Sequence, residues 1–152
     1  MQNQPMTSYS DPLDRFAGGN AGTLMLIARV LLGAIFVLSG YGKITDVGTF
    51  AAGLARQGVP MPEVMGWVGA IVEFFGGIAV VIGLRIRYAA LLMILFVIIA
   101  TAISHRYWEF TDAVARRGQT VQFQKNITII GGLIALFVAG AGKLALDPWR
   151  RQ

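Results

Sequence analysis

The sequence places an acidic residue, Glu73, at the centre of an apolar run that is long enough to cross a lipid bilayer. The run extends from about residue 64 to residue 84. A carboxylate in the hydrocarbon layer costs at least about 2.5–3.5 kcal/mol, so it must be neutral, paired or turned toward a polar cavity. A second charged residue, Arg29, interrupts another apolar run and is the natural partner. These two charges constrain how the helices that carry them can pack.

The composition indicates an integral membrane protein. Of the 152 residues, 55% are hydrophobic and only 14% are charged, whereas a soluble domain carries about 25% charged residues. The mean hydropathy is +0.62. So few charged side chains cannot coat a water-soluble globule, and the length indicates a single domain.

Four apolar runs, each of about 17–21 residues, predict four membrane-spanning segments, because a helix of that length crosses a hydrocarbon layer of about 30 Å. Backbone groups in lipid must be satisfied within the segment, so each run should be an α-helix. A β-barrel is excluded, since its strands would be shorter and would alternate apolar with polar residues. The predicted fold is an all-α, antiparallel bundle of four transmembrane helices, at about residues 23–43, 63–84, 88–107 and 122–143.

Both ends of the chain are expected to lie outside this membrane domain, which covers about residues 21–148. Residues 1–20 are polar and predict a disordered tail, and residues 149–152 form a short basic tail. Four spans place both termini on one side of the membrane. Lys and Arg are shared equally between the two sides, six against six, until Lys43 and Lys125 are set aside as site residues. Six positive residues then remain on the side of the termini and four on the other side, which predicts cytoplasmic termini.

Two helix faces are expected to pack together. On the first helix, a stripe at helical spacing comprises Arg29, Gly33, Phe36, Gly40 and Lys43. On the second, a similar stripe comprises Gly66, Gly69, Glu73, Gly76, Val80 and Gly83. Small residues on both stripes allow the backbones to approach closely.

The depths of the two charges predict a contact between Arg29 and Glu73. Arg29 lies nine residues after Asn20, or about 13 Å into the membrane, and Glu73 lies eleven residues before Leu84, or about 16 Å. Two other interpretations stay open. Arg29 could instead extend its side chain to the nearer membrane surface. The pair could also be a structural device that sets helix register, without any chemical role.

A second polar cluster is expected at the opposite side of the membrane, where the antiparallel topology gathers several helix ends. Its members are Lys43, His105, Gln122 and Asn126, with Thr101 one turn before His105. A histidine side chain exchanges protons near neutral pH, which suits proton transfer. The alternative is an interfacial histidine that only bonds a backbone carbonyl.

Several classes of function are excluded. The chain has no cysteine, so it forms no disulfide and performs no thiol chemistry. One histidine without a nearby carboxylate pair cannot complete a metal coordination sphere. The net charge of +5 is spread over short loops and indicates contact with anionic lipid head groups rather than nucleic acid. Transport stays as a third and least favoured hypothesis, because four unbroken spans offer no alternating-access machinery within one copy.

The chain resembles the DoxX family of membrane proteins over about residues 24–148. The resemblance is carried by RVLLGAIFVLSGYGKI from Arg29, EFFGGIAVVIGLRIRYAA from Glu73, HRYW from His105, QFQKN from Gln122 and the closing GAGKLALD. It implies a four-helix bundle in the bacterial inner membrane. The family is related to DoxD, the membrane subunit of an archaeal thiosulfate:quinone oxidoreductase, and some members resemble partners of oxidative-stress enzymes.

Two functional hypotheses follow from the residues and the resemblance. In the first, the chain is a membrane subunit of an oxidoreductase system that handles a quinone or a small sulfur oxyanion, together with a partner subunit and without a covalently bound cofactor. Glu73 and His105 would then transfer protons, and Arg29, Lys43, Gln122 and Asn126 would bind the substrate. In the second, the chain is a non-catalytic scaffold or small-molecule binder with a structural Arg29–Glu73 pair. Both leave the oligomeric state open.

Overall fold

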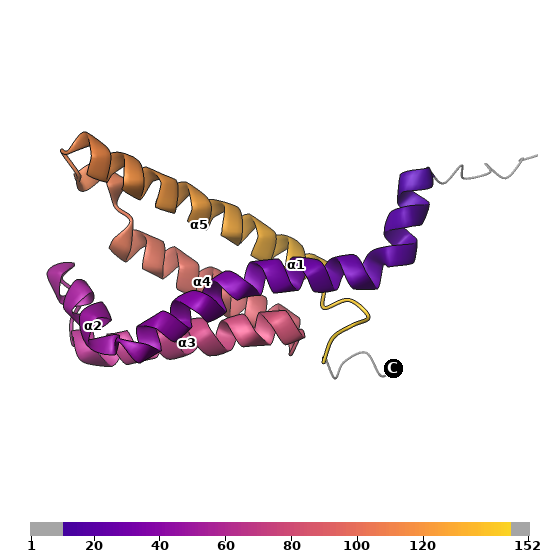
Figure 1. The fold of residues 1–152 in the computed structure, drawn as a ribbon, viewed down its shortest axis with the longest axis horizontal. Coiled ribbons are helices and arrows are strands. Elements are labelled where there is room, and N and C mark those ends of the chain that lie inside the picture. Colours follow the sequence, from indigo (N-terminus) through magenta and orange to yellow (C-terminus); the bar gives the residue numbers. More distant parts are fainter. Residues whose placement is uncertain (1–10, 147–152) are drawn as a thin grey trace, which may run out of the picture.

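A computed structural model describes residues 11–146 and confirms the all-α, four-span antiparallel bundle (Figure 1). Four helices are long and apolar enough to cross a membrane. They are α1 (Pro12–Thr45), α3 (Pro62–Ile82), α4 (Ile86–Ser104) and α5 (Ala113–Ala139). Two shorter elements complete the described chain, helix α2 (Val47–Arg56) and the 3₁₀ turn η1 (Tyr107–Glu109). The predicted third helix ran on to residue 107, but α4 ends at Ser104.

Helix α1 begins well before the predicted first span. The Asp11 side chain accepts a hydrogen bond from the backbone N–H of Leu13 at 3.0 Å, and Pro12 opens the helix. An acidic cap followed by proline is a strong helix start, so residues 12–20 are helical rather than a disordered tail. Figure 1 shows these first turns bent away from the rest of α1. Residues 1–10 and 147–152, which include the basic tail, lie outside the described part.

Helix α2 occupies the stretch that was predicted to connect the first two spans. Asp46 caps it by accepting from the backbone N–H of Thr49 at 3.2 Å. The apolar residues Phe50, Ala51 and Leu54 follow at helical spacing. They pack α2 against the first half of α3, and Ala51 and Leu54 are buried. An aspartate before apolar residues at this spacing is a recognisable signal for a short amphipathic helix.

Helix α5 starts at Ala113, nine residues before the predicted fourth span, and ends at Ala139 rather than near residue 143. Asp112 caps it by accepting from the backbone N–H of Ala115 at 2.8 Å. The added turns carry Arg116 and Arg117, which are exposed. These turns lie at the upper left of Figure 1, apart from α1 and α3.

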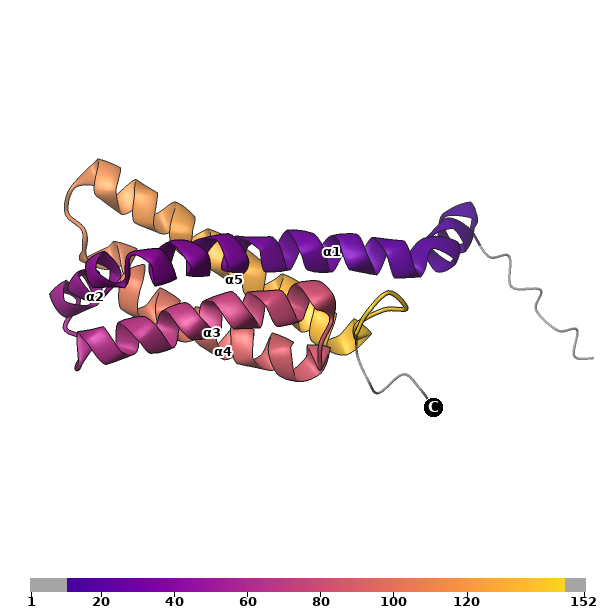
Figure 2. The ribbon, with the colours of Figure 1, turned by 60° about the horizontal axis from the view of Figure 1, so that its bottom comes forward.

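Close approach of two backbones joins α1 to α3 along most of their shared length (Figure 2). A Cβ at Gly33 would lie 2.9 Å from the carbonyl oxygen of Gly77, and a Cβ at Gly77 would lie 2.8 Å from the Cβ of Phe36. Only glycine permits this separation, as is usual where membrane helices pack through small residues. The predicted packing of the first stripe against this helix is confirmed.

The glycines of the predicted stripe on α3 mostly serve other neighbours, because α1 meets Phe74 and Gly77, which lie beside that stripe. Gly66 meets Ala51 of α2, where a Cβ would lie 3.3 Å from the Cβ of Ala51. Gly76 faces the thioether of Met93 in α4. The stripe is therefore divided among three helices, because α3 lies at the centre of the bundle.

The bundle has a small core and an apolar outer surface. The buried core comprises Phe36, Val80, Ile86, Ala89, Met93, Val97, Leu133, Leu136 and Ala141. Large apolar side chains such as Leu31, Leu38 and Val138 are more than 70% exposed. A soluble protein rarely exposes so much apolar surface, and these side chains instead face the acyl chains of the bilayer.

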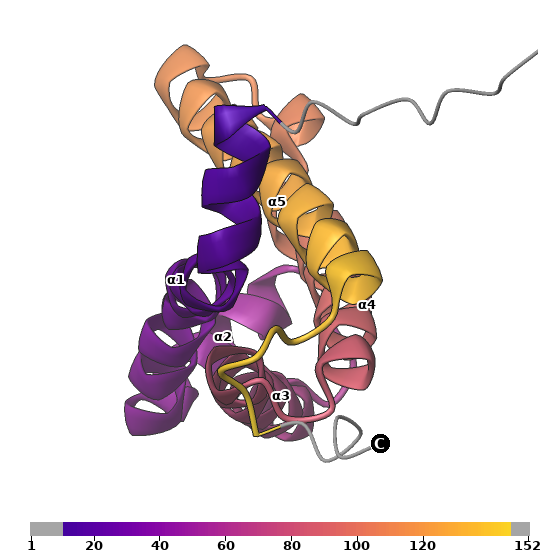
Figure 3. The same cartoon turned by 90° about the vertical axis from the view of Figure 1, so that its right-hand side faces the viewer.

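After α5 the chain turns back and crosses the end of α3 (Figure 3). Gly140 and Gly142 adopt positive φ angles of 79° and 76°, which make this reversal possible. The backbone N–H of Leu146 then donates to the carbonyl oxygen of Ile82 at 3.0 Å. Residues 140–146 thereby satisfy a carbonyl group at the C-terminal end of α3 that would otherwise lack a partner.

We expect Gly40→Ala to destabilise the protein by about 1–3 kcal/mol, the usual cost of overpacking. A Cβ at Gly40 would lie 2.6 Å from the backbone nitrogen of Phe74 and 2.8 Å from its Cα, and a backbone cannot move aside as a flexible side chain can. Gly42→Ala is the control, since a Cβ there meets nothing within 4 Å. Thermal unfolding in detergent would contradict the packing if the two variants were equally stable.

Candidate functional site

A pocket of about 160 Å³ lies inside the bundle and gathers most of the predicted site residues. It is lined by Ile35, Phe36, Ser39, Lys43, Glu73, Phe96, Val97, Ala100, His105, Lys125, Asn126 and Ile129. Lys43 and His105 come from helix ends, whereas Lys125 comes from the middle of α5. From His105 to Phe96 the pocket extends over nine residues of α4, or about 13 Å along its axis.

The Glu73 carboxylate is neutralised by Lys43, with which it forms a hydrogen-bonded ion pair. The Glu73 side chain is 7% exposed and that of Lys43 is 29% exposed. Close packing of α1 on α3 at Gly40 brings the two side chains together. The ion pair lowers the free-energy cost of placing the carboxylate in hydrocarbon, because two opposite charges in contact cost far less to bury than either charge alone.

Helix α2 helps to hold the ammonium group of Lys43 in place. The Lys43 Nζ lies 4.9 Å from the centre of the Phe50 ring, within the range of a cation–π contact. The same ring packs against Gly69, where a Cβ would lie 3.5 Å from the ring edge. The short helix therefore supports the site although it does not line the pocket.

The predicted pair between Arg29 and Glu73 is not formed. Arg29 is fully buried, and its Nη2 donates a hydrogen bond to the carbonyl oxygen of Leu144. Its guanidinium lies against Gly83, whose φ of 71° and missing side chain leave room for it. A cation at the C-terminal end of a helix complements the helix dipole, and here Arg29 also anchors residues 140–146. Arg29 does not line the pocket.

Helix register explains this error. Gly33 lies opposite Gly77 and Gly40 lies opposite Phe74, so Arg29 falls level with Gly83. Gly83 is ten residues from Glu73, or about 15 Å along the axis. The depth estimate assumed that both helices meet the membrane surface at residues 20 and 84. Instead α1 starts at Pro12, and the positions where its backbone can approach α3 set the register.

The single histidine sits at the rim of the pocket, where α4 ends. His105 Nδ1 lies 2.8 Å from Gln119 Oε1. The amide oxygen can only accept a hydrogen bond, so Nδ1 carries the proton and Nε2 keeps its lone pair in the neutral ring. The alternative prediction, a bond from the imidazole to a backbone carbonyl, is not what is observed.

One further hydrogen bond joins α4 to α5 beside the pocket, and a second lies within α4. Asn126 Nδ2 donates to Thr101 Oγ1 at 2.8 Å, and Thr101 Oγ1 donates to the carbonyl oxygen of Val97 at 2.6 Å. Thr101 is buried, so its hydroxyl needs these partners. The predicted grouping of His105, Thr101 and Asn126 at one end of the bundle is therefore observed.

Gln122 and Lys125 form a separate pair on α5, in which the Lys125 ammonium donates to Gln122 Oε1. Lys125 lines the pocket, whereas Gln122 does not. The set of candidate site residues in the sequence missed Gln119, because residues 105–125 were treated mostly as a connection. The cap at Asp112 was the available signal that Gln119 belongs to a helix.

Within residues 11–146, no group of three or more acidic, histidine or cysteine side chains could hold a metal ion. The pocket instead offers two ammonium groups, one carboxylate and one imidazole. Such a set can donate hydrogen bonds to oxygen atoms of a ligand and exchange protons with it.

Comparison with known proteins identifies the family. The sequence profile of DoxX matches residues 24–106. The chain belongs to the DoxX family. It is 31% identical over 131 residues to the inner membrane protein YphA of Escherichia coli, which covers 86% of this chain and 92% of that protein. The inner membrane protein YqjF of the same organism is 31% identical over 126 residues, or 81% and 88% of the two chains.

A shorter match extends to eukaryotes. The ER-derived vesicles protein ERV29 of Saccharomyces cerevisiae is 28% identical over 85 residues, which are 56% of this chain and 27% of that protein. No solved structure matches the chain significantly. The apolar helices and the two bacterial relatives together identify this DoxX protein as a multi-pass protein of the bacterial inner membrane.

A double-mutant cycle tests the observed ion pair. We expect Lys43→Met and Glu73→Gln to couple by about 0.5–3 kcal/mol, as residues in contact do. Arg29→Met and Glu73→Gln should be additive within about 0.5 kcal/mol, since distant residues rarely couple. The free energy of unfolding in mixed micelles is the measurement. Coupling between Arg29 and Glu73, with none between Lys43 and Glu73, would overturn the assignment.

Terminal fusions test the orientation. Both described ends lie at the same side of the four-span bundle, and the excess of positive charge there predicts a cytoplasmic location. We expect a C-terminal green fluorescent protein to fluoresce and a C-terminal alkaline phosphatase to remain inactive. The opposite pattern would place the pocket rim, with His105 and Lys125, at the cytoplasmic surface.

Proposed function

We propose that this DoxX protein is the membrane subunit of an oxidoreductase system, and that its pocket binds the head group of a quinone. The observation that carries the proposal is the meeting of Lys43, Glu73, His105 and Lys125 around one partly open pocket. Ionisable side chains inside a membrane domain are costly and usually mark a functional site.

The size of the pocket suits a single ring. Its volume is about 160 Å³, and an engineered protein cavity of about 150 Å³ binds benzene. Apolar side chains, among them Phe36 and Phe96, line the inner part of the pocket. A flat six-membered ring with polar oxygens at its edge fits such a mixed lining better than a fully hydrated ion does.

The polar side chains match the oxygen atoms of a quinone, which can only accept hydrogen bonds. An ammonium group has three N–H bonds. Lys43 makes one hydrogen bond, to Glu73, and Lys125 makes one, to Gln122. Each ammonium therefore retains donors for a ligand.

The same side chains can supply protons. Reduction of a quinone to a quinol adds two electrons and two protons at the two oxygen atoms. In our proposal the electrons come from a donor on a partner subunit. The protons come from the Lys43–Glu73 pair inside the pocket and from His105 at its rim, whose half-buried ring can exchange protons with water.

A small sulfur oxyanion is the alternative ligand of this site, since two ammonium groups face one carboxylate. The largely apolar inner lining favours the quinone. The second candidate function is a non-catalytic scaffold, in which Lys43–Glu73 takes the structural role once expected of Arg29–Glu73. The burial of Glu73 and its existing partner support that reading.

We expect the purified protein in lipid nanodiscs to bind a short-chain ubiquinone analogue, and Lys43→Met and Lys125→Met to weaken binding at least about tenfold, because each removes an ammonium group that donates to a quinone oxygen. Loss of a hydrogen bond to a charged group costs about 1.5–3 kcal/mol, and 1.4 kcal/mol is tenfold. Thr128→Ala is the control, because Thr128 lies on α5 but is exposed and outside the pocket.

Three results are informative. Equal affinity in all variants, or none in the natural protein, would favour the scaffold. Displacement of the analogue by thiosulfate at low concentration would favour the oxyanion. Binding that Lys43→Met and Lys125→Met weaken, that Thr128→Ala leaves unchanged and that thiosulfate does not displace would support the quinone site.

A further inference from the structure

The line of contact between α1 and α5, here called the α1–α5 seam, is the most loosely packed contact between neighbouring spanning helices. The pairs α1–α3, α3–α4 and α4–α5 pack over much of their length, whereas α1 and α5 touch only locally. In Figure 1 the two helices diverge from right to left, toward the end where α2 lies. One contact lies at Gly132, where a Cβ would lie 3.4 Å from Leu32 Cδ1.

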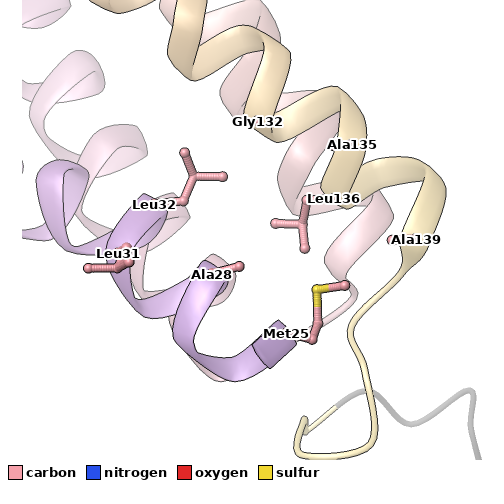
Figure 4. Close-up of a pocket in the computed structure, with 8 residues that line it drawn as sticks. All are labelled: Met25, Ala28, Leu31, Leu32, Gly132, Ala135, Leu136 and Ala139. Carbon is pink, nitrogen blue, oxygen red and sulfur yellow. The ribbon is translucent and has the colours of Figure 1, made fainter. Parts of the chain in front are cut away.

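An apolar groove of about 490 Å³ follows this seam (Figure 4). It is lined by Met25, Ala28, Leu31, Leu32, Gly132, Ala135, Leu136 and Ala139. Figure 4 shows Met25 near Ala139 at one end and Leu32 facing Gly132 at the other. Small side chains on α5 leave the space open, and Leu31, which is 72% exposed, borders it on the lipid side.

The groove ends about one helical turn from the polar pocket. One turn beyond Leu32, Ile35 and Phe36 of α1 already line the pocket, as Ile129 does one turn from Gly132 on α5. From Met25 to Lys43 the two spaces follow eighteen residues of α1, or about 27 Å. That length approaches the whole hydrocarbon layer of about 30 Å.

We propose that the α1–α5 seam holds the polyprenyl chain of the quinone whose head occupies the pocket, and that the ligand enters from the bilayer through this seam. The inference rests on the proposed function. A ligand that fits the combined space has one polar end and one long apolar chain, because the polar residues are confined to the Lys43 end.

The combined length of the groove and the pocket favours a long-chain quinone over a phospholipid or a second copy of the chain. Each acyl chain of a phospholipid spans one leaflet, about 15 Å, with its head at the membrane surface. The groove and the pocket together are almost twice that length, and their polar residues lie only at the Lys43 end. A second copy of the chain would fill the outer groove, but it would leave the pocket without a ligand.

The test uses a ubiquinone analogue with a photoreactive group at the end of a long prenyl chain. The full chain is placed in quinone-free nanodiscs of phosphatidylethanolamine and phosphatidylglycerol, irradiated, and mapped by peptide mass spectrometry. We expect label on residues 25–32 and 132–139, and competition by unlabelled long-chain quinone.

Matched variants separate the seam from the lipid-facing surface. Gly132→Phe should fill the groove and lower the labelling at least tenfold. It should also lower the preference for a long-chain over a tailless quinone about tenfold. Gly131→Phe should change neither, because a Cβ at Gly131 meets nothing within 4 Å and the residue faces outward. Ala135→Phe, at an exposed position in the groove, repeats the test should Gly132→Phe fail to fold.

The outcomes distinguish this inference from the proposed function. If tailless quinone binds but the label lies outside the seam, the seam inference is wrong and the head-group site stands. Labelling that is displaced by phospholipid, or cross-links between two chains at the seam, would also overturn the seam inference. Absence of binding by any quinone would overturn both proposals.

Discussion

The ion pair between Lys43 and Glu73 is the interaction on which the interior of this protein depends. A lone carboxylate at this depth would be expensive, and a lone ammonium hardly less so. The pair forms because glycines let α1 and α3 approach to backbone contact, so that the end of α1 reaches the middle of α3. Helix α2 then covers the site and places the Phe50 ring against the ammonium group.

The four spanning helices pack unevenly against one another. Three of the seams between them are closed by glycines, small residues and interlocking apolar side chains, while the α1–α5 seam stays loose. In a membrane such a gap costs little, because lipid is as apolar as the side chains that would otherwise fill it. The polar pocket lies about one helical turn from this loose apolar seam.

Arg29 shows how a charged residue in a span can serve structure instead of chemistry. Its guanidinium lies at the C-terminal end of α3, bonds the carbonyl of Leu144 and occupies the space that Gly83 leaves. The chain after α5 is thereby held across the end of α3. The same residue type that signals a substrate site in one helix can therefore act as an anchor for the chain end.

Much of the architecture could be predicted from local features. Apolar runs of sufficient length specify membrane helices wherever they fold, so the four spans and their antiparallel order followed from hydropathy. The gathering of Lys43, His105 and Asn126 at one end followed from that order. The errors lie at helix ends, where Asp11, Asp46 and Asp112 cap helices that extend or add to the predicted ones.

The amino-acid sequence by itself determined the membrane class, the number of spans and the need to neutralise Glu73. Only the tertiary structure decided that Lys43, rather than Arg29, is the partner. The physical reason is register: steric fit at Gly33, Gly40 and Gly77 fixes how far α1 slides along α3. A slide of a few turns would leave the hydropathy pattern unchanged, yet it would exchange which charges meet.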